Sequence, residues 1–374
     1  MGGRNMKTKR LSGATAEISL DAAAHNYLTL RAKTTAKFCC VVKANAYGHG
    51  AAPLATLYEK LGADYLAVAT AAEALALRRA GTRTPILILG YVPPEFAPRA
   101  VSEHLTITVY DRTQATALAA SARGDTLDVH LKIDTGMGRL GFLPGDAADA
   151  ATWIRTLPSL HVTGIYTHLA RADEGAGGCE ATQRQLQVFS EIASSVEKIL
   201  DRRLLRHAEN TAGLLLYPGG ALDMVRAGIG LYGYAPAGMT EPVPLSPVMT
   251  LAAPLVSVKD VPSGTPIGYG GTYVTDRRTT VGILPLGYAD GVPRLAGARG
   301  CRVSLGEKTA PVIGRVCMDQ TLLDLTACGG TLGDTVTVYG DTPGARLTDW
   351  ADRLGAIPYE LLTAIGTRVR RIYK

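Results

Sequence analysis

The sequence has few of the features that mark metal-binding, membrane or disulfide-rich proteins. Its six cysteines among 374 residues include no CxxC pair and no regular spacing, so neither a metal site nor a disulfide framework is predicted. No run approaches the roughly 18 consecutive apolar residues of a membrane-spanning helix. The N-terminus is polar and basic, with no apolar segment after it. The absence of a recognisable secretory signal predicts a cytoplasmic protein.

The sequence also lacks a strong excess or a concentrated block of charge of either sign. The formal net charge is +6, and the basic residues are spread along the chain in small clusters. A nucleic-acid-binding protein would concentrate them in a stripe, so we expect an anionic small molecule as the ligand instead. Apolar residues at 47% and charged residues at 19% are typical of a folded, enzyme-like chain. The length predicts about two domains.

Eight short β-rich runs alternate with alanine- and leucine-rich stretches in the first two thirds of the chain. Ala71–Ala80 and Ala181–Leu200 are examples of stretches with helical composition and spacing. Eight strand–helix units predict an α/β fold of the (β/α)₈ barrel type. The expected strands are Phe38–Val42, Tyr65–Ala69, Ile86–Leu89, Thr106–Tyr110, Asp128–Ile133, Val162–Thr167, Leu204–Ala208 and Asp223–Val225.

A second, β-rich domain is expected after the barrel. From residue 245 the composition shifts to valine, threonine, glycine and proline, and three prolines in 242–247 disfavour both helix and central strand. We therefore predict a flexible tail at 1–15, the barrel at 16–244 and the β-rich domain at 245–374. Its strand-like runs are Val248–Val258, Thr280–Leu284, Thr335–Val338 and Thr367–Tyr373.

Lys43 follows the first expected strand and enters a polar, glycine-punctuated turn. A lysine at the end of a buried strand is partly desolvated, which lowers its pKa and makes its amine a usable nucleophile for a Schiff base. The alternative is a lysine that only marks the strand end and extends its amine into water.

Further polar side chains follow later strands, where the active sites of such barrels gather. They are Lys132, Asp134 and Arg139 after strand five, His168 after strand six, Asn210 and Thr211 after strand seven, and Arg226 after strand eight, where Gly228 and Ile229 add backbone groups. Taken singly, each residue favours a structural interpretation: His168 as a hydrogen-bonded barrel-rim histidine, Arg139 as a surface ion-pair partner and Asn210 as a helix N-cap. The loops after strands seven and eight suit a phosphate, which backbone N–H groups and the Thr211 hydroxyl would bind.

A Schiff-base lysine opposite a phosphate loop implies pyridoxal 5'-phosphate (PLP). The sequence resembles the alanine racemases, which are fold-type III PLP-dependent enzymes, from about residue 16 to residue 373. The motifs that carry this resemblance are Val42–Gly50, Lys132–Gly141, Thr167-His168, Asn210-Thr211, Arg226–Gly233, Gly268–Gly270, Leu286–Gly291, Gly314–Gln320 and Pro358–Glu360.

The resemblance implies interconversion of L-alanine and D-alanine, which supplies D-alanine for peptidoglycan. Racemisation needs an acid or base on each face of the substrate α-carbon, and the matching residues are Lys43 and Tyr269. In the family this tyrosine comes from the partner subunit, so a homodimer with shared active sites is expected. Without the other motifs, Tyr269 would read as a surface aromatic.

The resemblance also implies the remaining site residues. Arg139 and Met318 match substrate-binding residues, and Lys132 matches a lysine that is carbamylated in many members. Arg226 matches an arginine that faces the pyridine nitrogen, and we expect His168 and Arg226 to supply the positive charge that makes Tyr269 a base. The matched cofactor-binding residues are Lys43, Tyr47, His168, Asn210, Thr211, Arg226, Gly228, Ile229 and Tyr359.

Three alternatives stay open at this point. One is a racemase with broader or serine preference, because a pocket discriminates poorly between small side chains. Another is a fold-type III amino-acid decarboxylase, which would place a carboxylate rather than Arg226 at the ring nitrogen. The last is a single-domain PLP-binding protein with a homeostatic role, which would lack the β-rich domain.

Overall fold

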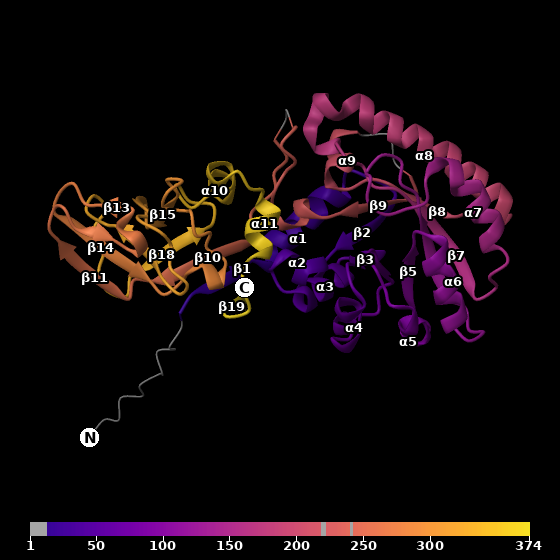
Figure 1. Ribbon diagram of the computed structural model, residues 1–374, viewed down its shortest axis with the longest axis horizontal. Helices are drawn as coiled ribbons and strands as arrows, with labels where there is room; N and C mark the ends of the chain where they lie inside the picture. Colours follow the sequence, from indigo (N-terminus) through magenta and orange to yellow (C-terminus); the bar gives the residue numbers. More distant parts are fainter. Residues whose placement is uncertain (1–12, 218–221, 240–241) are drawn as a thin grey trace, which may run out of the picture. The chain divides into compact units, whose positions relative to one another are not determined.

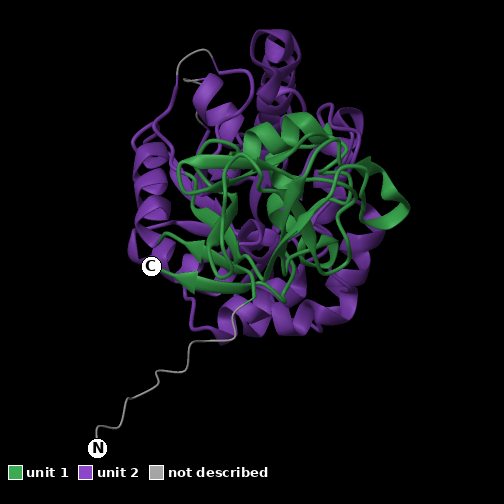
Figure 2. Ribbon diagram, turned by 90° about the vertical axis from the view of Figure 1, so that its left-hand side faces the viewer, with its two compact units in different colours: residues 1–19, 247–374 green, residues 20–246 purple. Residues whose placement is uncertain are grey.

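The computed structural model describes residues 13–217, 222–239 and 242–374. The chain divides into two compact units, which Figure 2 colours separately. One unit spans Leu20–Ser246, and the other joins the N-terminal residues up to Ser19 with Pro247–Lys374. Of the predicted tail at 1–15, residues 1–12 lie outside the described residues.

The unit Leu20–Ser246 contains eight parallel strands in the order β8-β7-β6-β5-β4-β3-β2-β9. Bonds from the Asp223 N–H to the Arg206 carbonyl and from the Arg226 N–H to the Glu209 carbonyl join β8 to β9 and close the barrel. The predicted (β/α)₈ architecture is therefore confirmed. The strands are β2 (Lys37–Val41), β3 (Tyr65–Val68), β4 (Ile86–Ile88), β5 (Leu105–Val109), β6 (Leu127–Lys132), β7 (Leu160–Tyr166), β8 (Leu205–His207) and β9 (Met224–Ala227).

Helices cover the outside of this barrel (Figure 1). The helix α8 shows why: it buries Thr182, Gln185, Phe189, Ala193 and Val196, whose spacing of three or four residues makes one stripe on its surface. Apart from the short α2, the α-helices of this unit are α1 (Leu20–Arg31), α3 (Ala51–Lys60), α4 (Ala71–Arg79), α5 (Ala97–Ser102), α6 (Arg112–Ser121), α7 (Ala147–Ile154), α8 (Cys179–Leu200) and α9 (Thr211–Leu216). Short turns are α2 (Lys43–Tyr47), η1 (Pro94–Phe96), η2 (Pro144–Asp146), η3 (Ala172–Gly178) and η4 (Ile229–Tyr232).

The other unit is β-rich, as predicted. A six-stranded sheet has the order β16-β15-β18-β10-β1-β19, a three-stranded sheet the order β11-β14-β17, and β12 pairs with β13. The strands are β1 (Thr15–Ile18), β10 (Met249–Pro254), β11 (Ser257–Val261), β12 (Pro266–Ile267), β13 (Tyr273–Val274), β14 (Thr279–Leu284), β15 (Arg302–Leu305), β16 (Lys308–Pro311), β17 (Thr321–Asp324), β18 (Thr335–Tyr339) and β19 (Arg370–Tyr373). The helices are η5 (Tyr269–Gly271), η6 (Tyr288–Asp290), α10 (Leu347–Leu354) and α11 (Pro358–Thr363).

Two boundaries differ from those expected. Thr15, assigned above to the flexible tail, and residues 16–18, assigned to the barrel, all belong to β1, which pairs with β10 and β19 in the other unit. The run Val248–Val258, expected as one strand, forms β10 and β11 in different sheets. Pro254 ends β10 because proline has no N–H to donate to a ladder.

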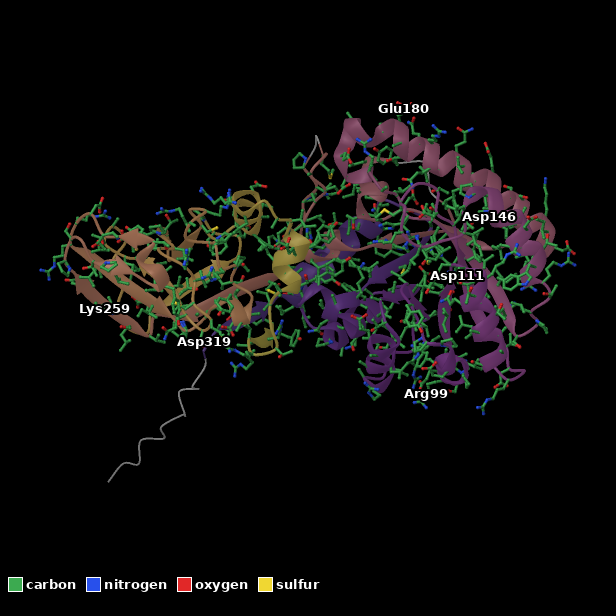
Figure 3. All side chains as sticks on the ribbon, in the orientation of Figure 1. Arg99, Asp111, Asp146, Glu180, Lys259 and Asp319 are labelled. Carbon is green, nitrogen blue, oxygen red and sulfur yellow. The ribbon has the colours of Figure 1, made fainter. Side chains whose placement is uncertain are left out.

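Charged side chains are distributed over both units, as the labelled Glu180 on α8 and Lys259 on β11 illustrate (Figure 3). This agrees with the scattered charge along the sequence. Within the described ranges, no helix has the length and apolar character needed to cross a membrane.

Candidate active site

The carboxyl ends of five barrel strands carry the polar residues singled out in the sequence. Lys43 and Tyr47 follow β2, and His168 follows β7. Lys132 is the last residue of β6, with Arg139 in the loop after it, while Asn210 and Thr211 follow β8. Arg226 was expected after the last strand but lies within β9, and Gly228 and Ile229 follow. Burial fixes its guanidinium more firmly than a loop would.

Arg226 is only 3% exposed, and its guanidinium is held on several sides. Nη2 donates to the carbonyl oxygens of Thr167 and Ala208, at 2.9 Å each, and to His168 Nδ1 at 3.3 Å. Nη1 donates to His207 Nδ1 at 2.7 Å. Burial lowers the pKa of Arg226, yet a guanidinium remains charged at neutral pH. The site therefore keeps a fixed cation.

His207 and His130 form a buried chain behind Arg226. Because Arg226 can only donate, His207 Nδ1 must accept, which places the His207 proton on Nε2. That N–H then donates to His130 Nδ1, 2.9 Å away. Burial lowers the pKa of His130 to about 3 and holds the pKa of His207 well below its ordinary value, so both rings are neutral.

His130 and His207 were not among the site residues expected from the sequence. Strand alternation could have indicated His130, because side chains two residues apart share a face and His130 therefore lies on the same face of β6 as Lys132. A Cβ at Gly164 would lie 2.6 Å from the His130 ring, so this glycine makes room for the imidazole. That contact depends on the tertiary structure.

The charge of the His168 ring differs from the one expected. Burial, followed by the charges of Arg226, Lys132, Arg139 and Lys43, holds its pKa well below the ordinary histidine value. The ring is neutral at neutral pH, so the expectation that His168 supplies positive charge is wrong. Since Nδ1 accepts from Arg226, His168 presents an Nε2–H donor instead.

Both site lysines have lowered pKa values. For Lys43 burial is the main cause, followed by the charge of Arg139. For Lys132, which is 4% exposed, burial and the charges of Arg226 and Arg139 lower the pKa to about 7. The Lys132 amine lies 4.8 Å from the centre of the Tyr166 ring. The uncharged, nucleophilic amine of Lys132 is therefore abundant near neutral pH, and burial favours the uncharged form of Lys43 relative to an exposed lysine.

Asp134 shapes the loop that carries Arg139. Its carboxylate accepts hydrogen bonds from the backbone N–H groups of residues 136 to 139, at 2.7 to 3.0 Å. Burial alone would raise the pKa of Asp134, but these bonds outweigh it and lower the pKa. The carboxylate is thus committed to the backbone, and it holds the loop around Arg139 in one conformation.

The loops after β8 and β9 form a small cradle of donors. Thr211 Oγ1 accepts from the N–H groups of Gly228 and Gly230, at 2.9 and 3.4 Å, so its own hydroxyl proton is left to donate. A Cβ at Gly228 would lie 2.8 Å from the Tyr47 hydroxyl oxygen, so glycine lets these groups converge. The N–H of Ile229 begins η4 and has no partner within that turn.

Asn210 has a local structural task. Its Oδ1 accepts from the Gly213 N–H at 2.9 Å and caps α9. This is the helix N-cap alternative considered above. It leaves the amide nitrogen of Asn210 as the group available to a ligand.

The other unit carries Tyr269, Met318 and Tyr359, which are 67%, 53% and 39% exposed. Tyr269 lies in η5 between Gly268 and Gly270, both with positive φ. Met318 accepts at its carbonyl from the Ala289 N–H. The barrel residues are thus gathered in one unit, whereas these three belong to the unit that contains the β-rich segment.

Comparisons with known proteins agree with this arrangement. Residues 18–236 match the family described as alanine racemase, N-terminal domain, and residues 248–373 match alanine racemase, C-terminal domain. The chain belongs to the alanine racemase family. An alanine racemase of Desulfovibrio desulfuricans is 42% identical over 364 residues, covering 96% of this chain and 97% of that one.

Solved structures of the alanine racemase family share the fold. The alanine racemase of Clostridium difficile 630 has a TM-score of 0.91 and 34% identity, over 98% of this chain and 97% of that one. The enzyme of Streptomyces coelicolor A3(2) has a TM-score of 0.90 and 38% identity, over 96% and 98% of the two chains. The match to both domains leaves no place for the single-domain alternative.

The alanine racemase family depends on PLP, and the barrel residues fit this group. Lys43 offers a desolvated amine to an aldehyde, and the Thr211, Gly228 and Tyr47 cradle offers donors to a phosphate. Arg226 offers a fixed donor to a ring nitrogen. Within the described residues, no group of three or more His, Cys, Asp or Glu side chains could hold a metal ion.

Proposed function

We propose that this protein is a PLP-dependent alanine racemase that interconverts L-alanine and D-alanine with two bases, Lys43 and Tyr269. The observation that carries the proposal is the gathering of Lys43, Arg226 and the Thr211 cradle at the carboxyl end of one barrel, in a chain of the alanine racemase family. Each of these groups meets a different chemical need of the same cofactor.

Lys43 holds the cofactor covalently in this proposal, and Tyr47, Thr211 and the backbone at Gly228 and Ile229 hold its phosphate. Asn210, His168 and Tyr359 complete the binding set. Arg226 donates to the ring nitrogen and keeps its own proton, because a guanidinium does not readily release one. The hydrogen bonds to His207, Thr167 and Ala208 keep the guanidinium aimed in a single direction.

Bound PLP withdraws electrons from the substrate α-carbon and so acidifies its C–H bond. Once the substrate amine has replaced it on the cofactor, the freed Lys43 amine would take or return the α-proton on one face, and Tyr269 would do so on the opposite face. The lowered pKa of Lys43 gives its amine an uncharged form that can accept a proton. Arg139 and the backbone at Met318 bind the substrate carboxylate.

Lys132 is proposed to be carbamylated. An uncharged amine attacks carbon dioxide and releases one proton to solvent as the carbamate forms, and the pKa of about 7 makes the uncharged amine abundant at neutral pH. The carbamate replaces a cation beside Arg139 and Arg226 with an anion. It would therefore orient Arg139 by attraction where a protonated lysine would repel it.

The exposed Tyr269 and Met318 are proposed to reach the barrel of a second copy of the chain, which makes the enzyme a homodimer with shared active sites. We also propose a cytoplasmic role in supplying D-alanine for peptidoglycan. The six cysteines are free thiols, as expected in a reducing compartment.

Chiral chromatography of products from purified, PLP-loaded protein tests this proposal. L-alanine should yield D-alanine, and a panel of alanine, serine, lysine and arginine in both hands should show alanine turned over fastest. Serine turnover above that of alanine would support the broader alternative. Release of carbon dioxide without D-alanine would support the decarboxylase and refute the racemase.

A further inference from the structure

The segment that connects Lys43 to Tyr47 has an unusual backbone. Ala44, Asn45, Ala46 and Tyr47 have φ between 51° and 54°, so four consecutive residues with side chains adopt the left-handed helical conformation. In this conformation the Cβ crowds the following carbonyl oxygen, and such residues normally occur singly. Consecutive strain of this kind persists only when the surrounding structure enforces it, and it concentrates at functional sites.

The strained turn has functional residues at both ends. Lys43, proposed to hold the cofactor, precedes it, and Tyr47, part of the phosphate cradle, ends it. An ordinary right-handed turn would place these two side chains differently. The left-handed turn therefore sets the separation between the reactive amine and the cradle.

Glu73 on α4 fastens this turn to a neighbouring element, as does Asn45, whose Oδ1 accepts from the Ala51 N–H at the start of α3. Glu73 Oε1 accepts from the Ala44 N–H at 2.6 Å. Its Oε2 accepts from the Ala69 N–H at 2.8 Å and from the Thr70 N–H at 3.2 Å. One carboxylate thus joins the first left-handed residue to the end of β3 and the start of α4.

The same carboxylate contributes charge at the site. The groups that lower the pKa of Lys43 after burial are Arg139 and Arg226, and Glu73 acts in the opposite direction. His168, the remaining titratable group that interacts with Lys43, is neutral. Among the described residues that act on the Lys43 amine, Glu73 is the anion, so its removal should change the amine as well as the turn.

We propose that Glu73 is a positioning residue of the racemase site, which clamps the left-handed turn to α4 and so holds Lys43 and Tyr47 in their working places. This inference rests on the proposed function. The competing explanation is an ordinary capping box, because the Thr70 hydroxyl also accepts from the Glu73 N–H at 3.2 Å. The two explanations differ in what the Ala44 bond does.

Two matched substitutions distinguish the positioning role of Glu73 from an ordinary capping box. Thr70→Ala removes the Thr70 hydroxyl's half of the capping box, the bond from the Glu73 N–H, but leaves the bonds from the Thr70 and Ala44 N–H groups to the Glu73 carboxylate. Glu73→Gln removes the charge, and its amide has one accepting oxygen where the carboxylate has two. If Glu73 acts only as a cap, both variants should behave alike.

The first readout is the affinity of the full chain for PLP, which is monitored through the visible absorbance of the lysine-bound cofactor. Glu73→Gln should bind PLP about tenfold more weakly than wild type, the ratio expected for losing a hydrogen bond to a charged acceptor. Thr70→Ala should retain nearly wild-type binding and a comparable melting temperature. Equal binding by both variants would overturn the proposal.

The second readout needs no cofactor. Acetic anhydride labelling of the full chain stripped of PLP, analysed by mass spectrometry across a pH series, reports the pKa of the Lys43 amine. Glu73→Gln should shift the labelling midpoint to lower pH, and Thr70→Ala should leave it unchanged. An unchanged midpoint in both variants would contradict the role of Glu73.

A third variant covers the case in which Glu73→Gln does not fold. Glu73→Asp keeps the charge on a shorter side chain, so it should weaken PLP binding while leaving the Lys43 midpoint near that of wild type. Wild-type binding by Glu73→Asp would overturn the proposal. A wild-type protein that binds no PLP at Lys43 would instead refute the proposed function, which keeps the two failures distinct.

Discussion

His207 Nδ1 lies 2.7 Å from Arg226 Nη1, and this contact fixes where the proton of a buried imidazole resides. Because the guanidinium always donates, the His207 proton occupies Nε2. That N–H donates to His130 Nδ1, which fixes the tautomer of His130 as well. A chain of neutral histidines thereby holds a permanent cation inside the barrel. Among the described residues, no carboxylate forms a hydrogen bond or salt bridge with the Arg226 guanidinium, and Glu209 acts on it only through its electrostatic field, so Arg226 can point at a ligand.

Replacing His207 should therefore destabilise the protein. His207→Phe leaves an Arg226 donor buried without an acceptor, which should lower the free energy of unfolding by about 1–3 kcal/mol. His207→Asn should lower it less, because the amide oxygen can take the place of Nδ1. Urea unfolding followed by circular dichroism measures both.

His161 provides the control for this pair. Its ring contacts Asp128 at 2.7 Å on the surface, where such a pair contributes about 0–1 kcal/mol. His161→Phe should accordingly change stability less than His207→Phe. A larger effect at His161 would show that the buried chain does not hold Arg226 as described.

The lowered pKa of Lys132 predicts how the free energy of unfolding depends on pH. Its pKa falls from 10.5 to about 7 in the folded protein, so between these values the unfolded chain binds the extra proton. Stability contributed by Lys132 should then rise with pH, by at most about 1.4 kcal/mol per pH unit. Below pH 7 this contribution is constant and unfavourable.

The measurement compares wild type with Lys132→Met under carbon-dioxide-free conditions, by denaturant unfolding from pH 6 to pH 10. The difference in unfolding free energy should grow in favour of wild type as the pH rises. Added bicarbonate should stabilise wild type further through the carbamate. A pH-independent difference would contradict the lowered pKa.

Thr211 should contribute to phosphate binding through its hydroxyl. Thr211→Val removes that donor and also the acceptor for the Gly228 N–H, so PLP affinity should fall at least about tenfold. Thr211→Ser keeps the hydroxyl and should retain most of the affinity. Thr116→Val, on the exposed side of α6, is the control and should bind PLP like wild type.

The dimer proposal predicts complementation between inactive chains. Lys43→Ala and Tyr269→Phe should each lack activity, and mixing them should restore some activity, because one mixed site has both intact residues. Refolding the two variants together and assaying D-alanine formation checks this. Activity that stays absent in a proven mixed dimer would place both residues in the same subunit's site.

The barrel could be predicted from the sequence because its strands are short apolar runs, and their carboxyl ends displayed Lys43, His168 and Thr211 in order. Local patterns also predicted α4 and α8 closely. The pairing of β1 with β10 and β19 could not be predicted, because it joins segments more than two hundred residues apart. Nothing in the composition of Thr15–Ile18 favours one sheet over another.

The contacts that support the site residues could not be predicted from the sequence either. The left-handed turn at Ala44–Tyr47 contains no glycine, so no local rule indicates it. The bond from Ala44 to Glu73 and the chain from Arg226 to His130 exist only once the strands lie side by side. The charge of His168 was misjudged because burial and neighbouring cations, which determine it, are properties of the folded barrel.

The most direct test of the two-base account is hydrogen exchange by Tyr269→Phe in deuterium oxide. The variant should keep the visible absorbance of the cofactor on Lys43 and should exchange the α-hydrogen of one alanine enantiomer, because Lys43 still serves its face. It should not exchange the other enantiomer or interconvert the two. Racemisation by Tyr269→Phe at the wild-type rate would show that another group serves the second face and would contradict the account.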